Sequence, residues 1–219
     1  QKIKATANYF HNLVINGTSA SSGTGYVVNT FDGLRKALTG TSNDFTTDID
    51  LSDSAKLDSN ANAFVDQLDQ LTHMVDGSAS LLLMNTAMLL KVRAAARRAG
   101  YYDRKKDDFG RAVEYFGDIP IMDAGMYYNG TKSVDVIDTS TPSASVAGTS
   151  SIYAVNIALD GFHGISPTGT GVINSYMPDL KAPGAVKKGE VELVAGVVLK
   201  NTLKAAALNG IALKAKTSV

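Results

Sequence analysis

The sequence predicts an α+β fold, and three observations support this. Amphipathic helical patterns dominate the first half of the chain, whereas short strand patterns separated by glycine or proline dominate the second half. No internal repeat recurs at a fixed period. With 219 residues, 44% of them apolar, the chain is long enough to bury a substantial core in one or two domains.

The helices are predicted from apolar spacing and terminal residues. Residues 2–15 place apolar side chains three or four apart, and the glycine- and serine-rich stretch that follows ends this helix near Asn16. The segment 31–38 is a glycine-centred turn followed by a short apolar run. A second helix is predicted from Asp58 or Ser59, as N-cap, to a point before Gly77. A third begins after Asn85 and stops at Gly100.

The strands are predicted from short apolar runs bounded by turn residues. "SLLLMN" at 80–85 indicates a buried strand, and 111–125 indicates two strands joined at Gly117 and Asp118, with Pro120 limiting how centrally the second can lie. The threonine- and aspartate-rich stretch 41–58 is expected to be loop with one strand, and 139–151 to be loop. Strand patterns then follow to the C-terminus.

Composition excludes some classes of protein. The 21 basic and 21 acidic residues cancel, so the whole chain has no charge typical of a nucleic-acid or anionic-membrane binder. Absence of cysteine excludes disulfides and thiolate chemistry. No apolar run approaches the roughly 20 residues of a membrane span. The first residues lack a methionine and already have a helical pattern, so we expect the natural chain to begin earlier.

The stretch "IALDGFHGISPTGTGVINSY" at 157–176 raises the question of catalysis. Asp160, His163 and Ser166 could form a hydrolase triad, but the chain has no G-x-S-x-G sequence, and a histidine between glycines often has a structural role. Gly169 and Gly171 lack the rest of a dinucleotide fingerprint. Asp48, Asp50 and Asp53 could hold calcium, but the glycine and glutamate of the helix-loop-helix motif are missing. We therefore predict no catalytic residue, cofactor or metal.

Two Asn-Gly-Thr sequences, at Asn16 and Asn129, match the glycosylation pattern but are better interpreted as turns.

Charge is unevenly distributed along this neutral chain. Residues 44–76 hold eight aspartates against Lys56, and residues 181–219 hold seven lysines against two glutamates. A basic run covers Arg93, Arg97, Arg98, Arg104, Lys105 and Lys106. Three interpretations stay open for this run: nucleic-acid contact, a solvated helix end that complements the helix dipole, and contact between subunits. Complementary patches favour head-to-tail association of copies of the chain.

Several segments in a fixed order resemble a known family. They are "LVINGTS", "FDGL", "LDSNANAFVDQLDQLTHMV", "SLLLMNTAMLLKVRAAAR", "YFGDIPIMDAG" and "DGFHGIS". Together they resemble the major capsid protein of tailed bacteriophages, the Hong Kong 97-type fold that encapsulins share. Nearly the whole chain is covered. The family's N-terminal arm and extended loop have no counterpart, because the sequence starts within the spine helix.

The resemblance implies an axial domain and a peripheral domain. Residues 1–17 and 165–219 are expected to be peripheral and 18–164 axial. It implies a non-enzymatic protein that assembles into hexamers and pentamers of an icosahedral shell around phage double-stranded DNA, held without sequence specificity and assembled in the bacterial host cytoplasm. Scaffolding, portal or decoration proteins are further partners that it leaves open, and no membrane is involved.

On that basis the candidate subunit contacts are the basic run and an acidic group, Asp44, Asp48, Asp50 and Asp53. An encapsulin-like shell around protein cargo is the main alternative, and a hydrolase using Ser166, His163 and Asp160 is a further one. In the capsid interpretation His163 is structural.

Overall fold

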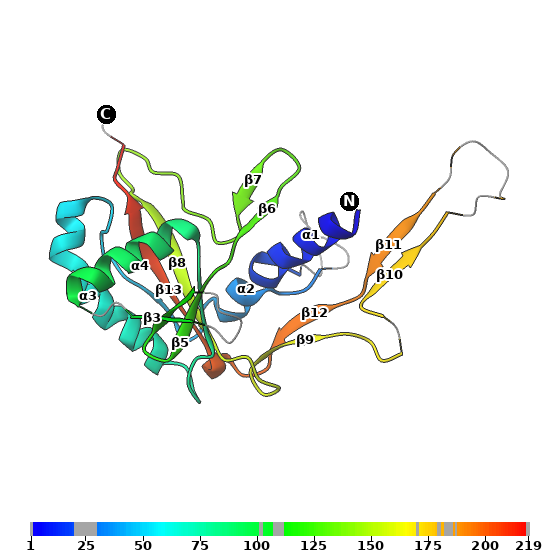
Figure 1. The fold of residues 1–219 in the computed structure, drawn as a ribbon, viewed down its shortest axis with the longest axis horizontal. Coiled ribbons are helices and arrows are strands. Elements are labelled where there is room, and N and C mark those ends of the chain that lie inside the picture. Colours follow the sequence, from blue (N-terminus) through cyan, green and yellow to red (C-terminus); the bar gives the residue numbers. More distant parts are fainter. Residues whose placement is uncertain are drawn as a thin grey trace.

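A computed structural model describes residues 2–19, 30–100, 103–106, 112–169, 171–178, 181, 186 and 188–217; for 2, 103–106 and 112 it describes the backbone alone. The helices are α1 (Lys2–Asn16), α2 (Leu34–Leu38), α3 (Ser54–His73), α4 (Thr86–Ala99) and the short η1 (Thr202–Lys204). Two parts are visible in Figure 1: a body built on a large sheet, and a long arm of paired strands that projects from it.

The body contains a seven-stranded mixed sheet with the strand order β1-β13-β8-β2-β5-β4-β3. Its strands are β1 (Asp44–Thr46), β2 (Leu81–Met84), β3 (Asp103–Lys106), β4 (Ala112–Phe116), β5 (Ile119–Asp123), β8 (Gly148–Val155) and β13 (Ala205–Lys214). β1 with β13 and β2 with β5 are parallel pairs, and the other neighbours are antiparallel. Strands drawn from residues 44 to 214 thus form one sheet.

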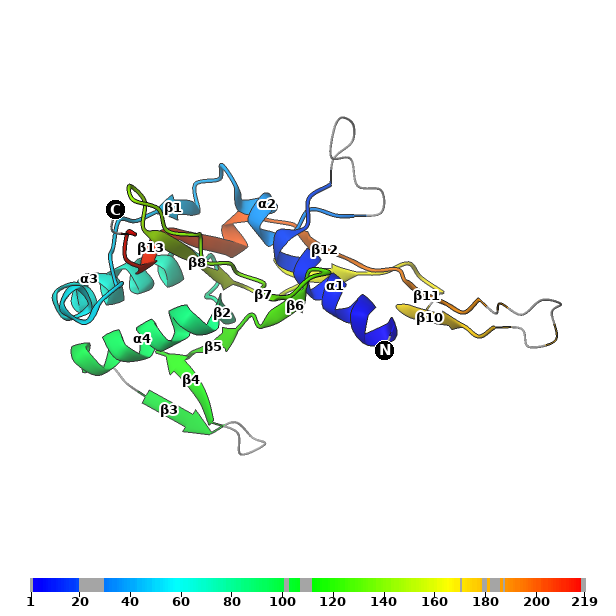
Figure 2. The same cartoon turned by 90° about the horizontal axis from the view of Figure 1, so that it is seen from above.

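The arm consists of two narrow ribbons. β9 (Phe162–Ile165) pairs with β12 (Gly196–Leu199), and β10 (Ile173–Tyr176) pairs with β11 (Glu190–Leu193). Figure 2 shows α1 lying beside the base of this arm. A third ribbon, β6 (Met126–Tyr128) with β7 (Ser133–Asp135), lies on the other side of α1.

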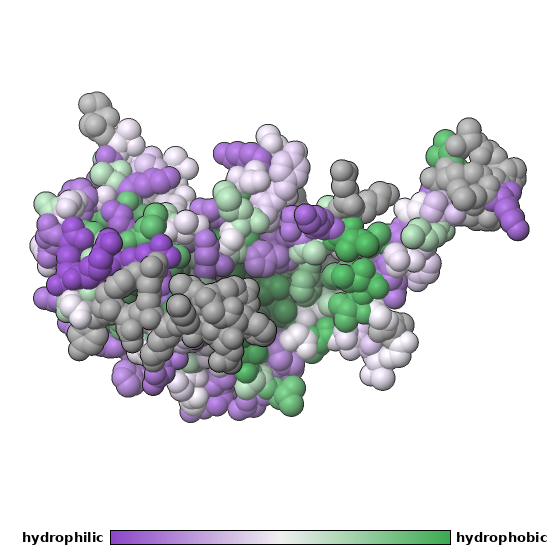
Figure 3. Space-filling view, in the orientation of Figure 1, coloured by the Kyte–Doolittle hydropathy of each residue, from purple (hydrophilic) through white to green (hydrophobic). Residues whose placement is uncertain are grey.

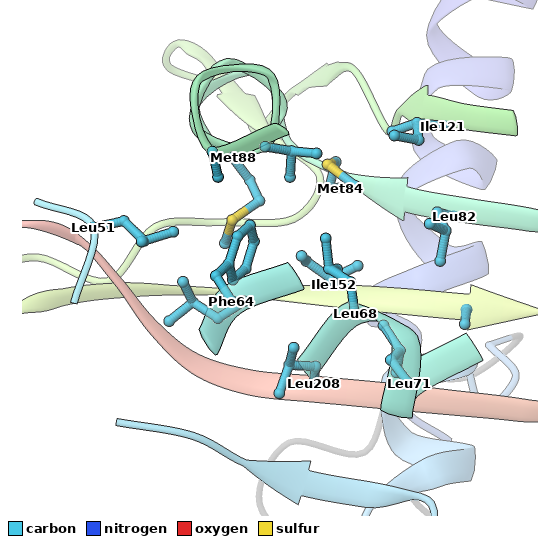
Figure 4. Packing of buried hydrophobic residues seen from close by; sticks show 14 of the residues in the cluster. Leu51, Phe64, Leu68, Leu71, Leu82, Met84, Met88, Ile121, Ile152 and Leu208 are labelled. Atoms are coloured by element: carbon cyan, nitrogen blue, oxygen red, sulfur yellow. The ribbon is translucent and has the colours of Figure 1, made fainter. Parts of the chain in front are cut away.

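Apolar side chains cover both faces of the central strands. On one face, α3 and α4 pack through Phe64, Leu68 and Met88 against Ile152 and Leu208 (Figure 4). On the other face, Tyr153 and Val155 of β8 belong to a second cluster with the end of α1, α2 and the segment around Ile137. Successive residues of a strand face opposite sides. β8 is therefore buried along four consecutive residues, Ile152 to Val155.

Helix ends follow the predicted signals with one correction. Asn85 accepts a hydrogen bond from the backbone N–H of Met88 at 2.8 Å and caps α4, which ends at Gly100 in a left-handed conformation, as predicted. The predicted N-cap of α3, Asp58 or Ser59, is wrong. The helix starts earlier, because the side chain of Asp53 accepts the N–H of Lys56 at 2.9 Å.

Two of the glycine motifs meet in space. The backbone N–H of Gly33 donates to the carbonyl of Gly17 at 2.9 Å, which joins the end of α1 to the segment before α2. A β-carbon on Gly17 would lie 2.5 Å from the carbonyl oxygens of Leu13 and Phe31. "LVINGTS" and "FDGL" therefore need glycine because two backbones approach too closely for a side chain.

The positions of β5 and β13 in the sheet differ from two expectations about strands. Pro120 was expected to limit β5, yet β5 lies between β4 and β2. The sheet tolerates the proline because β2 pairs only with residues 121–123, one position beyond it. β13 lies within 165–219 but pairs with β8 in the large sheet, alongside strands from the expected axial range. The division into axial and peripheral domains stays a prediction.

Within the part of the chain that is described, no helix combines the length and the apolar character of a membrane span.

Candidate subunit-contact surfaces

The basic residues of α4 divide into internally bonded and free side chains. Arg93 donates from Nε to Glu114 at 2.6 Å, so it joins α4 to β4. Arg98 bonds to Asp58 of α3 and to Ser54, the latter at 3.3 Å. The side chain of Arg97 is exposed and makes no hydrogen bond or ion pair with the residues that the structure describes. Of these three, Arg97 is the one available for a partner.

Arg104, Lys105 and Lys106 occupy β3, the last strand of the seven-stranded sheet. Their side chains lie outside the described structure, but their backbone pairs with β4 in the order Arg104↔Glu114, Lys105↔Val113 and Lys106↔Ala112. The basic run predicted as a contact surface is therefore split between a helix end and a sheet edge.

The acidic residues divide in the same way. Asp44 accepts from the side chain of Asn209 at 2.6 Å, and Asp53 caps α3. Asp50 accepts from Lys56 at 2.6 Å. Asp48 is exposed and is without a partner in the described part of the chain.

The pKa of Asp50 reflects its bonds. Partial burial favours the neutral acid, but the hydrogen bond from the Lys56 ammonium, with those from Ser52, outweighs burial and lowers the pKa below the ordinary aspartate value. The carboxylate is thus committed to holding the start of α3. Among the described residues, no group of three or more acidic or histidine side chains is arranged to hold a metal ion.

The three residues of the alternative hydrolase triad lie at the base of the arm. His163 is in β9 opposite Val198, and its Nδ1 is buried without a hydrogen-bond partner in the structure described. The carboxylate of Asp160 lies 3.4 Å from the ammonium of Lys204. Ser166 follows the end of β9 and lines a pocket with Pro167 and Val194. A triad needs hydrogen bonds from acid to histidine to serine. The structure gives Asp160 a different partner.

Lys204 instead holds the joint between arm and body. Its ammonium contacts Asp76 at 3.1 Å as well as Asp160, and its side chain is 13% exposed. The hydrogen bond to Asp76, followed by the contribution of Asp160, raises the pKa of Lys204 despite its partial burial. The backbone N–H of Asn156 also donates to the carbonyl of Lys204 at 2.9 Å. One lysine therefore links the loop after α3, the start of the arm and the start of β13.

Sequence reasoning missed an apolar surface on the arm. Large apolar side chains that are about half or more exposed are concentrated there and on its base: Ile157, Leu159, Ile165, Val172, Ile173, Tyr176, Met177, Val186 and Leu203. On the body, comparable exposure occurs at Leu90 of α4, at Met122 of β5 and at Val146 before β8. Residues of α1 and of the β6–β7 ribbon are exposed to a similar extent: Ile3, Tyr9, Met126 and Tyr128. Figure 3 shows hydrophobic residues gathered where the arm leaves the body. The sequence feature that could have revealed this surface is a strand pattern with apolar residues on both faces.

Comparison with solved structures identifies the fold. The chain aligns over 100% of its length with the encapsulin of the holo-SrpI complex from Synechococcus elongatus PCC 7942, with a TM-score of 0.65 and 13% sequence identity. The alignment covers 66% of the encapsulin chain. This chain has the Hong Kong 97-type shell fold.

A weaker structural likeness, with a TM-score of 0.44 and 10% identity over 66% of this chain and 46% of the other, is to a protein described as an Escherichia coli prophage capsid protein. No family model and no curated protein matches the sequence. The predicted α+β class and shell-type fold are confirmed by the alignment with the encapsulin.

Proposed function

We propose that this chain is a subunit of a closed protein shell, which it forms by self-assembly into hexamers and pentamers. The fold supports this proposal, because the encapsulin with which the whole chain aligns has the same architecture. The peripheral part would then consist of α1 and the arm, and the axial part of the seven-stranded sheet with α3 and α4. In this version β13 belongs to the axial part, since it pairs with β1 and β8.

The observation that carries the proposal is the arm. Tyr176, the last residue of β10, is 57% exposed, and Met177, directly after it, is 86% exposed. β10 and β11 form a ribbon of two strands. Such a ribbon is marginally stable in water by itself and is stabilised by a further strand or by packing. Contiguous exposed apolar surface commonly marks a protein–protein contact. Burial against neighbouring copies would satisfy both requirements.

The experiment replaces apolar residues on the arm by polar ones. The arm variant carries three substitutions together, Ile173→Thr, Tyr176→Thr and Met177→Ser. Threonine favours strands, so the two positions in β10 keep strand-forming residues while the arm loses exposed apolar surface. The matched control is Leu90→Ser with Val146→Ser, where the replaced side chains are 55% and 56% exposed on the body. Electron microscopy and sedimentation should show particles for the wild type and the control, and free subunits for the arm variant. Particles from all three proteins, or from none, would contradict the proposal.

The contents of the shell divide the proposal into two versions. The sequence motifs resemble phage major capsid proteins, and this favours a virion shell around double-stranded DNA, assembled in a bacterial host. The alternative, a nanocompartment around protein cargo, is favoured by the fold likeness to an encapsulin. Nuclease treatment of purified particles decides between them. Protected DNA supports the capsid, and particles that contain protein without nucleic acid support the nanocompartment.

A further inference from the structure

The two edges of the seven-stranded sheet have opposite charge. β1 forms one edge and β3 the other. From Asp44 to Asp53 the chain at the β1 edge carries four aspartates and no basic residue. β3 consists of Asp103, Arg104, Lys105 and Lys106, so three of its four residues are basic. In Figure 2 the two strands lie on opposite sides of the body.

The outer side of β1 has backbone groups free to pair. The carbonyls of Asn43 and Ile49 accept from β13, and the N–H of Thr47 donates to it, at 2.8–2.9 Å. Because backbone groups of successive strand residues point to alternate sides, those of Thr46 and Asp48 point away from β13. They make no hydrogen bond with the residues that the structure describes.

At the opposite edge, β3 pairs with β4 on one side, and no described strand lies on its other side. An open edge is a template for pairing with another chain, and proteins commonly protect such edges with charged residues. Here the protection is selective. Two β1 edges repel because both are acidic, and two β3 edges repel because both are basic. Only β1 against β3 brings opposite charges together.

We propose that β1 of one copy pairs edge to edge with β3 of the next, so that the sheet continues from subunit to subunit. Such a contact joins two different surfaces, which is the head-to-tail geometry that generates rings. The inference rests on the proposed shell function for its partner, a second copy of the chain. It adds which strands meet and assigns a role to Asp48, whose carboxylate is uncommitted, and to the basic residues of β3.

Disulfide trapping tests the contact directly, because the chain contains no cysteine. The variant Thr46→Cys, Lys105→Cys would place one thiol on each edge, and Thr46→Cys, Arg104→Cys covers the neighbouring register. Asp66→Cys with Lys105→Cys is the control, since Asp66 is exposed on α3 and belongs to neither edge strand. Under oxidation, at least one edge pair should give a ladder of covalent oligomers on a non-reducing gel, and the control should give none.

The outcomes separate this inference from the shell proposal. Particles with no ladder in either register would overturn edge pairing and leave the shell standing. A ladder without particles would support edge pairing and overturn the shell. No ladder and no particles would overturn both.

A charge exchange gives a second measurement. Asp48→Lys should lower the yield of assembled oligomers about tenfold, and adding Lys105→Glu should restore it, whereas Asp66→Lys should leave it unchanged. Failure of the double variant to recover while each single variant remains folded would also overturn the pairing.

Discussion

The body and the arm of this molecule differ in what stabilises them. In the body, β8 is buried on both faces, with Tyr153 1% and Ala154 0% exposed. In the arm, each ribbon has two strands, and Met177 remains 86% exposed. The body is thus stabilised by its own packing, whereas the arm leaves large apolar side chains exposed in the part of the chain that the structure describes. Substitutions in the two parts should therefore be separable: one set affects folding and the other affects assembly.

The largest expected difference is between a core and an arm aromatic residue. Phe64 is 0% exposed between α3, α4 and the sheet, so Phe64→Ala should lower the free energy of unfolding by about 3–5 kcal/mol. Tyr176→Ala removes a side chain that is 57% exposed and should change it by less than about 0.5 kcal/mol. Urea denaturation followed by circular dichroism measures both. Equal losses would show that the arm is part of the folding unit.

A buried asparagine gives the next largest effect. Asn85 caps α4 and donates to the carbonyl of Ile137 at 2.9 Å and to Ser150 at 3.1 Å. Asn85→Ala should cost about 2–3 kcal/mol, because it removes a cap and leaves buried groups unpaired.

Asn129 is the matched control for this change. Its side-chain oxygen accepts two hydrogen bonds, at 3.0 Å, from the N–H groups of Thr131 and Lys132, but on the exposed β6–β7 turn. Asn129→Ala should cost less than about 1 kcal/mol. A similar loss in both variants, measured by urea denaturation, would mean that burial of the bonds around Asn85 adds nothing.

The sequence predicted local features of the body better than the pairing of distant segments, for physical reasons. Helix caps and tight turns depend on neighbouring residues. The cap at Asn85, the helix stop at Gly100 and the turn at Gly117 and Asp118 could therefore be predicted from the local sequence. The start of α3 was misjudged because several aspartates near it can act as caps. The cap is Asp53, and Lys56 bonds both to it, through the backbone N–H, and to Asp50, through the ammonium. The pairing of β13 with β8 joins residues far apart in sequence, and no local pattern encodes it.

The candidate contact residues show the same limit. Sequence pattern placed Arg93, Arg97 and Arg98 in one basic run, and charge alone could not tell them apart. The partners Glu114 and Asp58 come from other elements, and only folding brings them to Arg93 and Arg98. The role of the basic and acidic groups as subunit contacts stays a prediction. The structure narrows the candidates for a subunit contact to Arg97, Asp48 and the two edges of the seven-stranded sheet.

The joint between body and arm should respond to alkaline pH. Asp76 and Asp160 raise the pKa of Lys204 above its ordinary value, which is about 10.4. Stability from this ion pair is present below the unfolded pKa and is lost as pH rises through the folded pKa. The difference in urea midpoint between the wild type and Lys204→Met should therefore be constant from about pH 7 to 9.5 and shrink above about 10.4.

The carboxylates provide the control for this titration. In the variant Asp76→Asn, Asp160→Asn the ammonium has lost both partners, so further replacement of Lys204 by methionine should produce a difference without that alkaline decline. A decline of the same size in this background would assign the pH response to other groups.

The smallest expected effect compares two neighbouring arginines in the last turn of α4. Arg98→Ala removes the bonds to Asp58 and to Ser54 of α3, and should lower the free energy of unfolding by about 0.2–1 kcal/mol, the usual range for a surface ion pair. Arg97→Ala removes the same charge from the same helix end, so any contribution from the helix dipole is common to both. Without an internal partner, Arg97 should leave stability almost unchanged.

If Arg97 instead binds a neighbouring subunit, its loss should lower particle yield at constant unfolding midpoint. Equal destabilisation by both variants would show that the bond between α3 and α4 contributes nothing measurable, and an Arg97→Ala protein with full particle yield would remove this arginine from the contact surface.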